Sequence, residues 1–344
     1  MELYDIGDIR KFRSTNCNFN FNRVTGYTEV WGRTEEENPD YLPYGPMIAD
    51  IEITTSCGGP KGIPCPFCYK GNTKNGKNMS LETFKQVFHK LPKTVTQIAF
   101  GADADLSSNP DVFDIMHYCR NNDYNYVVPN VTVADVNTEL AEKLSAVCGA
   151  VAVSRYADKG ICYDSVNKLT DQGMKQVNIH MMLSEETFDQ AVETIFDIRN
   201  DKRLGKLNAI VFLSLKTKGR GKHFHKLSEE KFSRIIYLCM MFGVRYGFDS
   251  CSANKFLKAV EILPNYKELE QMAEPCESTL FSTYIDVEGK FYPCSFCENV
   301  EGWEDGLDVV NCTDFLKDIW LCEKTFKFRE KLLSCGRNCP IYNV

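Results

Sequence analysis

Hydrophobic residues in the middle of the chain follow two alternating patterns. Short apolar runs are separated by segments in which apolar residues return every three or four positions, the spacing of an amphipathic helix. The apolar runs predict strands over residues 49–54, 97–100, 126–133, 151–154, 177–181, 209–215 and 243–249. In the first helical segment Phe84, Val87, Phe88 and Leu91 share one face, and Ser80 can serve as its N-cap. Six repeated strand–helix units predict an α/β fold with a parallel sheet that curls into a full or partial barrel.

The pattern changes at both ends of this region. Residues 1–46 are expected to be an N-terminal extension with a short hairpin around Thr25-Gly26. Residues 47–254 form the barrel unit. In residues 255–344 the elements are short, a turn is expected at Glu288-Gly289, and seven cysteines are present. This last region is predicted to be a small domain stabilised by metal.

Composition excludes several classes of protein. The 344 residues are 43% hydrophobic and 25% charged, which is ordinary for a globular protein. The net charge of −7 disfavours a nucleic-acid partner, and no apolar run is long enough to cross a membrane. The N-terminus lacks the features of a secretory signal, so we expect a cytoplasmic protein. Since cytoplasmic thiols stay reduced, clusters among the sixteen cysteines indicate metal ligands.

The first cysteine cluster lies in the loop after the first strand and consists of Cys57, Cys65 and Cys68. In a parallel barrel this loop belongs to the face where active sites are built. Three thiolates leave one iron of a four-iron cluster open, whereas a structural zinc site is closed by a fourth ligand. Zinc and unrelated thiols remain the alternatives from this loop alone.

These cysteines, with Phe67 before the third and Tyr69 after it, resemble the cluster motif of the radical S-adenosylmethionine (SAM) superfamily. The first gap, residues 58–64, is longer than is usual in that family. After the second strand, residues 101–104 resemble the family stretch that holds the amino group of SAM. Lys218-Gly219-Arg220 resembles a further family turn. The resemblance implies a partial (β/α)6 TIM-like barrel and SAM-binding roles for Phe67, Gly101, Ala102, Asp103, Ser154 and Arg155. For Arg155 and Arg220 the alternative is a solvated loop.

The second cysteine cluster resembles the SPASM and shorter twitch domains, which carry auxiliary clusters in radical SAM enzymes. The resemblance rests on Cys276, Gly289, Cys294 and the terminal pair Cys335 and Cys339. It implies a twitch-like domain with one auxiliary [4Fe-4S] cluster, besides the SAM-binding [4Fe-4S] cluster. The implied auxiliary ligands are Cys276, Cys294, Cys335 and Cys339. Cys297, Cys312 and Cys322 are expected to be bystanders, although Cys297 is close enough in sequence to substitute.

The resemblance implies reductive cleavage of SAM to a 5′-deoxyadenosyl radical. That radical abstracts a hydrogen from a peptide or protein side chain, and a flavodoxin or ferredoxin supplies the electron. Because few residues precede Cys57, a separate peptide-recognition protein is expected for a peptide substrate. One alternative is a small-molecule substrate, such as a phosphorylated metabolite or a nucleotide, that undergoes dehydrogenation or rearrangement. A second alternative is a non-catalytic iron–sulfur protein.

Two residues at the end of the last predicted strand are candidates for catalysis. Asp249 is a candidate proton acceptor and Cys251 a candidate hydrogen-atom donor, with a loop-capping carboxylate and a buried thiol as the alternatives. His180 is expected to be an inward-facing histidine within the fifth strand. The basic run of residues 216–226 is expected to be a solvated loop, or else a grip for an acidic substrate.

Overall fold

A large parallel sheet forms the centre of the protein. The structure is a computed structural model that describes residues 1–101, 106–155 and 158–342. Within these residues the main sheet has ten strands, in the order β11-β10-β9-β8-β7-β6-β5-β12-β13-β14. Its parallel strands from the predicted barrel region are β5 (Ile48–Ile51), β6 (Gln97–Phe100), β7 (Val128–Val133), β8 (Ala150–Ser154), β9 (Val177–Leu183), β10 (Ala209–Ser214) and β11 (Tyr246–Phe248). Each corresponds to a strand predicted from the sequence, and the predicted α/β fold with a parallel sheet is confirmed.

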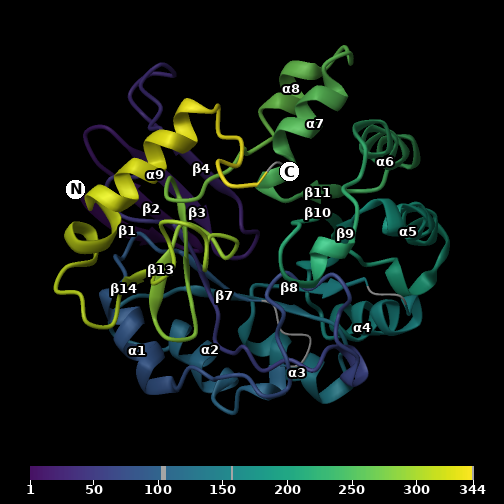
Figure 1. Ribbon diagram of the computed structural model, residues 1–344, viewed down its shortest axis with the longest axis horizontal. Coiled ribbons are helices and arrows are strands. Elements are labelled where there is room, and N and C mark those ends of the chain that lie inside the picture. Colours follow the sequence, from purple (N-terminus) through teal and green to yellow (C-terminus); the bar gives the residue numbers. More distant parts are fainter. Residues whose placement is uncertain (102–105, 156–157, 343–344) are drawn as a thin grey trace.

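Six helices follow one another around the outside of this sheet (Figure 1). They are α1 (Leu81–Lys90), α2 (Val112–Arg120), α3 (Thr138–Val147), α4 (Lys159–Asp171), α5 (Phe188–Asn200) and α6 (Glu229–Phe242). The predicted N-cap of α1 is confirmed, since the Ser80 hydroxyl accepts a hydrogen bond from the Thr83 N–H at 3.1 Å. Helix α1 buries Phe84, Val87 and Phe88 against the sheet. The helices thus pack on the outside of the sheet through their apolar faces, and the ends of the strands remain available to form a site.

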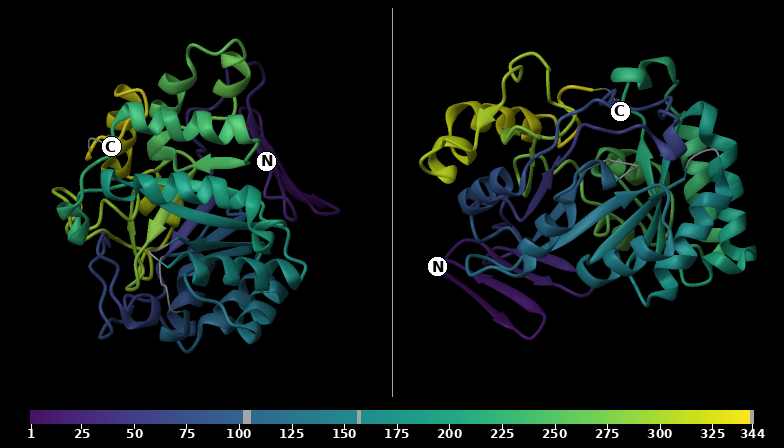
Figure 2. Two further views of the ribbon diagram at one scale, coloured as in Figure 1. Left: turned by 90° about the vertical axis from the view of Figure 1, so that its right-hand side faces the viewer. Right: turned by 90° about the horizontal axis from the view of Figure 1, so that it is seen from below.

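The N-terminal extension is more regular than predicted. It is a four-stranded antiparallel sheet of β1 (Glu2–Ile6), β2 (Ile9–Arg13), β3 (Asn18–Asn22) and β4 (Thr28–Trp31). The predicted hairpin is β3–β4, whereas β1 and β2 were not predicted. Alternate residues of β2 and β3 are buried, including Phe12, Phe19 and Phe21. The sheet projects from one side of the main body (Figure 2).

The C-terminal region continues the main sheet. Its elements are α7 (Ala253–Val260), α8 (Tyr266–Glu270), β12 (Ser282–Ile285), β13 (Lys290–Tyr292), β14 (Leu307–Asp308) and α9 (Glu323–Ser334). Strand β12 pairs in parallel with β5 and then antiparallel with β13. The turn predicted at Glu288-Gly289 joins β12 to β13, and Gly289 has a positive φ of 79°. The Trp320 indole N–H donates to the Leu42 carbonyl at 2.7 Å, which fixes this region to the segment before β5. No helix in the described ranges has both the length and the apolar character to cross a membrane.

Candidate functional site

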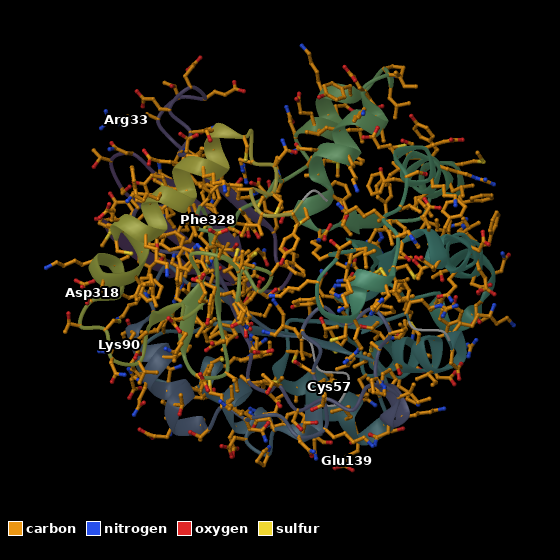
Figure 3. All side chains as sticks on the ribbon, viewed as in Figure 1. Arg33, Cys57, Lys90, Glu139, Asp318 and Phe328 are labelled. Carbon is orange, nitrogen blue, oxygen red and sulfur yellow. The ribbon has the colours of Figure 1, made fainter. Side chains whose placement is uncertain are left out.

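A cavity of about 430 Å³ lies where the carboxyl ends of the parallel strands meet. The loop after β5 brings Cys57, Cys65 and Cys68 into its wall. The ends of β6, β8 and β11 contribute Gly101, Ser154 and Asp249 to the lining. The remaining lining includes Phe67, Arg155, His180 and Lys216. Figure 3 labels Cys57. Three thiols from one loop therefore share one cavity with polar groups from distant strands.

Backbone hydrogen bonds shape the cysteine loop. The Cys57 N–H donates to the Thr73 carbonyl at 2.8 Å, and the Gly59 N–H donates to the Cys57 sulfur at 3.4 Å. The Cys68 N–H donates to the Cys65 carbonyl at 3.3 Å, which turns these two cysteines toward the same side. An N–H group aimed at sulfur favours the thiolate, the form that binds metal.

The loop after β10 holds the cysteine loop in place. Arg220 donates from its backbone N–H to the Cys68 carbonyl at 2.9 Å and from Nε to the Cys65 carbonyl at 2.8 Å. Gly219 has a φ of +55°, and a Cβ there would lie 2.4 Å from the Tyr69 carbonyl oxygen. Only a glycine permits this close approach. Arg220 is therefore a structural support of the cysteine loop rather than a solvated side chain.

Three of the predicted SAM-binding residues also border a second space, of about 470 Å³, next to the first, whereas Gly101 lines the first cavity alone. Phe67, Ser154 and Arg155 line both cavities. Phe67 packs edge-on against Phe224, with the ring centroids 5.9 Å apart. Arg155 is only 4% exposed and lies 3.2 Å from a Glu193 carboxylate oxygen, so it is not a solvated loop residue. The predicted residues Ala102 and Asp103 lie outside the described residues.

A third cavity, of about 140 Å³, gathers cysteines of the C-terminal region. Its lining includes Cys251, Cys276, Cys294, Cys297 and Cys339. Cys335 is not part of this lining; its thiol donates to the carbonyls of Leu332 at 3.2 Å and Asn338 at 3.0 Å. The structure thus brings together three of the four predicted auxiliary ligands, together with Cys297, which was expected to be a bystander. In the described part of the chain, no three His, Cys, Asp or Glu side chains converge closely enough to hold a single metal ion.

Hydrogen bonds around Cys294 favour its thiolate. Its sulfur lies 3.4 Å from that of Cys297, and the two are not bonded as a disulfide. The Cys297 thiol, the backbone N–H groups of Phe296 and Cys297, and the Ser278 hydroxyl hold the pKa of Cys294 well below its usual range, although burial opposes this. The same contact and burial raise the pKa of Cys297.

One wall separates the first and third cavities, and Asp50, Lys216, Asp249 and Phe296 line both. The Lys216 ammonium is buried, lies 2.6 Å from the Asp249 carboxylate, and stands 4.8 Å from the centre of the Phe296 ring. Burial, with the nearby Cys294, raises the pKa of Asp50 to about 7. Sequence analysis missed Asp50 and Lys216 as site residues, although a carboxylate inside a buried strand is an available signal.

The two candidate catalytic residues differ in the cavities that they line. Asp249 faces both cavities, and its carboxylate also accepts from the Ser214 N–H at 3.1 Å. Cys251 lines only the third cavity, and burial raises its pKa, so the thiol keeps its proton. His180 faces the first cavity, as expected, and burial lowers its pKa to about 4.

A buried polar cluster ties the cysteine loop to the C-terminal region. The Lys70 ammonium lies 3.2 Å from the Glu52 carboxylate and also contacts the Glu298 carboxylate. The Tyr284 hydroxyl accepts from Lys70 at 2.8 Å and donates to Glu52 at 3.0 Å. Lys70 is two residues from Cys68 in the sequence, so this cluster restrains the loop from the side of β12.

No family model and no curated protein matches this chain, but solved structures share its fold. The structure titled native anSMEcpe with bound AdoMet and Kp18Cys peptide has a TM-score of 0.58 and 14% identity, covering 82% of each chain. The same protein with the Cp18Cys peptide has a TM-score of 0.56, 14% identity and coverage of 82% of this chain and 81% of that one. SuiB of Streptococcus suis, bound to S-adenosylmethionine, has a TM-score of 0.54 and 14% identity, covering 83% of this chain and 65% of SuiB. These similarities support the mixed α/β fold with a large parallel sheet that the sequence predicted.

Proposed function

We propose that this protein is a radical SAM enzyme. The observation that carries the proposal is the convergence of Cys57, Cys65 and Cys68, all from one loop, on a cavity at the carboxyl ends of the parallel strands. Three cysteine ligands suit a four-iron cluster that keeps one iron open for SAM. The N–H group aimed at the Cys57 sulfur fits this role, because it stabilises a ligand thiolate.

The other residues of the site are proposed to hold SAM. Phe67 offers an aromatic ring, while Ser154 and buried Arg155 offer polar groups at the join of the two adjacent cavities. Gly101, with Ala102 and Asp103, belongs to the same proposed binding set. When bound, the reduced cluster and SAM supply one-electron cleavage of the sulfonium and a 5′-deoxyadenosyl radical. The protein positions these groups and excludes water from them.

Asp249 and Cys251 are proposed to act on the substrate. The Asp249 carboxylate, oriented by Lys216 and the Ser214 N–H, is placed to accept a proton in the first cavity. Cys251 keeps its S–H bond, as a hydrogen-atom donor requires, but it lines only the third cavity. To donate a hydrogen atom to a substrate in the first cavity, the Cys251 thiol would have to reach past Lys216, which lines both cavities.

A peptide or protein side chain is the substrate class we favour. Two of the structures that share the fold, both of anSMEcpe, contain a bound peptide. A small molecule, such as a phosphorylated metabolite, is the second candidate, because Lys216 places an ammonium, paired with Asp249, in the cavity wall. We further propose a flavodoxin or ferredoxin as electron donor, a separate peptide-recognition protein, and an auxiliary cluster in the third cavity.

Iron loading and SAM binding together test this proposal. Wild-type protein, purified or reconstituted without oxygen and then reduced with dithionite, should give a four-iron cluster signal in electron paramagnetic resonance (EPR) that changes when SAM is added. Cys57→Ala should abolish the SAM-dependent change. Cys322→Ala should retain it, since that thiol donates to the Ile319 carbonyl at 3.3 Å, away from the cysteine loop. Zinc in place of iron, or a signal that ignores SAM, would overturn the proposal.

The substrate class is tested by isotope transfer. Deuterated candidate peptides and deuterated phosphorylated metabolites are incubated in separate reactions with reduced protein and SAM. Deuterium in the 5′-deoxyadenosine identifies the substrate that loses hydrogen. Transfer from peptides supports the favoured class, and transfer only from small molecules supports the second.

A further inference from the structure

We propose that Cys297, and not Cys335, completes the auxiliary cluster site with Cys276, Cys294 and Cys339. This inference rests on the proposed function, because it assumes that the third cavity holds an iron–sulfur cluster. It concerns which cysteines of this chain bind the cluster. The resemblance in sequence implies Cys335 as the remaining ligand, not Cys297.

Position is the first argument. The four proposed ligands line one cavity, which Cys335 does not reach. Cys294 and Cys297 are joined by a tight turn in which the Cys297 N–H donates to the Cys294 carbonyl at 2.9 Å. This turn brings the two sulfur atoms to 3.4 Å, and two cysteines separated by two residues are a recurrent ligand pair in iron–sulfur and zinc sites.

The hydrogen-bond environment of each sulfur is the second argument. The sulfur atoms of metal ligands commonly accept hydrogen bonds from N–H and O–H groups in the surrounding shell. Cys294 receives the N–H groups of Phe296 and Cys297, Cys276 receives the Ser278 N–H, and the Cys339 sulfur accepts from the Tyr342 N–H at 3.2 Å. The Cys335 sulfur instead faces two carbonyl oxygens. The Cys335 sulfur is therefore engaged by backbone carbonyls outside the cavity, unlike the sulfurs of Cys276, Cys294 and Cys339.

The end of helix α9 explains why the two terminal cysteines differ. The helix ends at Ser334, so Cys335 still bonds its last turn through the Leu332 carbonyl. Arg337, with a φ of +58°, then donates from Nε to the Cys276 carbonyl at 3.0 Å. That bond draws the following segment toward Cys276 and brings Cys339 into the cavity, while Cys335 stays on the outer side.

Two matched variants test the assignment. Cys297→Ala should lower the iron content from about eight to about four atoms per chain and remove the auxiliary EPR signal. The SAM-dependent signal of the first cluster should persist, which shows that the variant is folded. Cys335→Ala should keep both clusters and the full iron content. Loss of the auxiliary cluster in Cys335→Ala, or its retention in Cys297→Ala, would overturn the proposal.

A measurement on the wild-type protein tests the same assignment without relying on the folding of the Cys297 variant. The loaded protein is treated with iodoacetamide without oxygen, and modified cysteines are located by peptide mass spectrometry. Cys335 should be alkylated while the clusters are intact, because it is partly accessible and unligated. Protection of Cys335 that disappears after removal of iron would overturn the proposal. Absence of iron from the wild-type protein would instead contradict the proposed function.

Discussion

The buried Lys216 ammonium lies 2.6 Å from the Asp249 carboxylate, in the wall shared by the two thiol-lined cavities. Lys216 comes from the loop after β10, and Asp249 follows β11, so the pair joins the ends of adjacent strands. The amine also contacts the Cys251 thiol. One ion pair thus fixes the candidate base of the first cavity and borders the proposed auxiliary site.

Removal of one partner should cost more stability than removal of both. Lys216→Met leaves the Asp249 carboxylate unpaired and should lower the free energy of unfolding by about 3 kcal/mol. The double variant Lys216→Met/Asp249→Asn should recover part of this loss, because no uncompensated charge remains. Urea titrations of the wild-type, single and double variants measure the effect. A double variant less stable than Lys216→Met would show that the ion pair is not the reason.

The polar cluster around Lys70 should be another sensitive point. Lys70→Met leaves the Glu52 and Glu298 carboxylates buried without their cation and should destabilise the fold by about 3–5 kcal/mol. Because Lys70 follows Cys68 closely, the first cluster should also be lost more readily. Lys77→Met is the matched control, since the Lys77–Glu288 pair is exposed and should contribute little. Equal effects of the two substitutions in urea unfolding would contradict this account.

Gly219 and Gly173 allow backbone strain to be separated from contact with the cysteine loop. Both have positive φ values, of 55° and 86°, so alanine at either position costs about 1 kcal/mol. Only Gly219→Ala places a Cβ against the Tyr69 and Cys68 carbonyls. Gly219→Ala should therefore also reduce iron loading of the first cluster, whereas Gly173→Ala should not. Equal iron contents in the two variants would contradict the claim that contact with residue 219 holds the cysteine loop in place.

His180 should make the folded state sensitive to acid. Its pKa is lowered by burial from 6.5 to about 4, so the unfolded chain takes up a proton at higher pH than the folded one. The stability associated with neutral His180 is complete above pH 6.5 and is lost as the pH falls toward 4. His180→Gln should flatten this part of the stability profile, while exposed His117→Gln should leave it unchanged. Identical profiles for wild type and His180→Gln would contradict the burial effect.

Local patterns predicted much of the fold and of the first site. The periodicity of apolar residues located the parallel strands, and Ser80 was correctly identified as a helix cap. The position of Cys57, Cys65 and Cys68 after a strand sufficed to place them at the carboxyl ends of the sheet. Strand β2 was missed, because its alternate residues become buried only when it pairs with β3. Strand β1 was missed because it is almost wholly exposed and pairs only with β2.

Contacts between distant segments were not predictable in the same way. Lys216 belongs to a basic run that looks solvated, and its burial depends on Asp249 and on Phe296 from the C-terminal region. Lys70 likewise finds Glu298 far along the chain. The surroundings of Cys335 and Cys297 depend on where α9 ends and where the Cys294–Cys297 turn lies, which the spacing of cysteines alone does not reveal.

The central claim is tested most directly by chemical analysis of SAM after reduction. Iron-loaded wild-type protein is mixed with SAM and dithionite without oxygen, and methionine and 5′-deoxyadenosine are quantified over time, beside Cys68→Ala. The account predicts equal amounts of the two products from the wild-type protein and none above background from the variant. Intact SAM in the presence of a fully reduced wild-type cluster would contradict it.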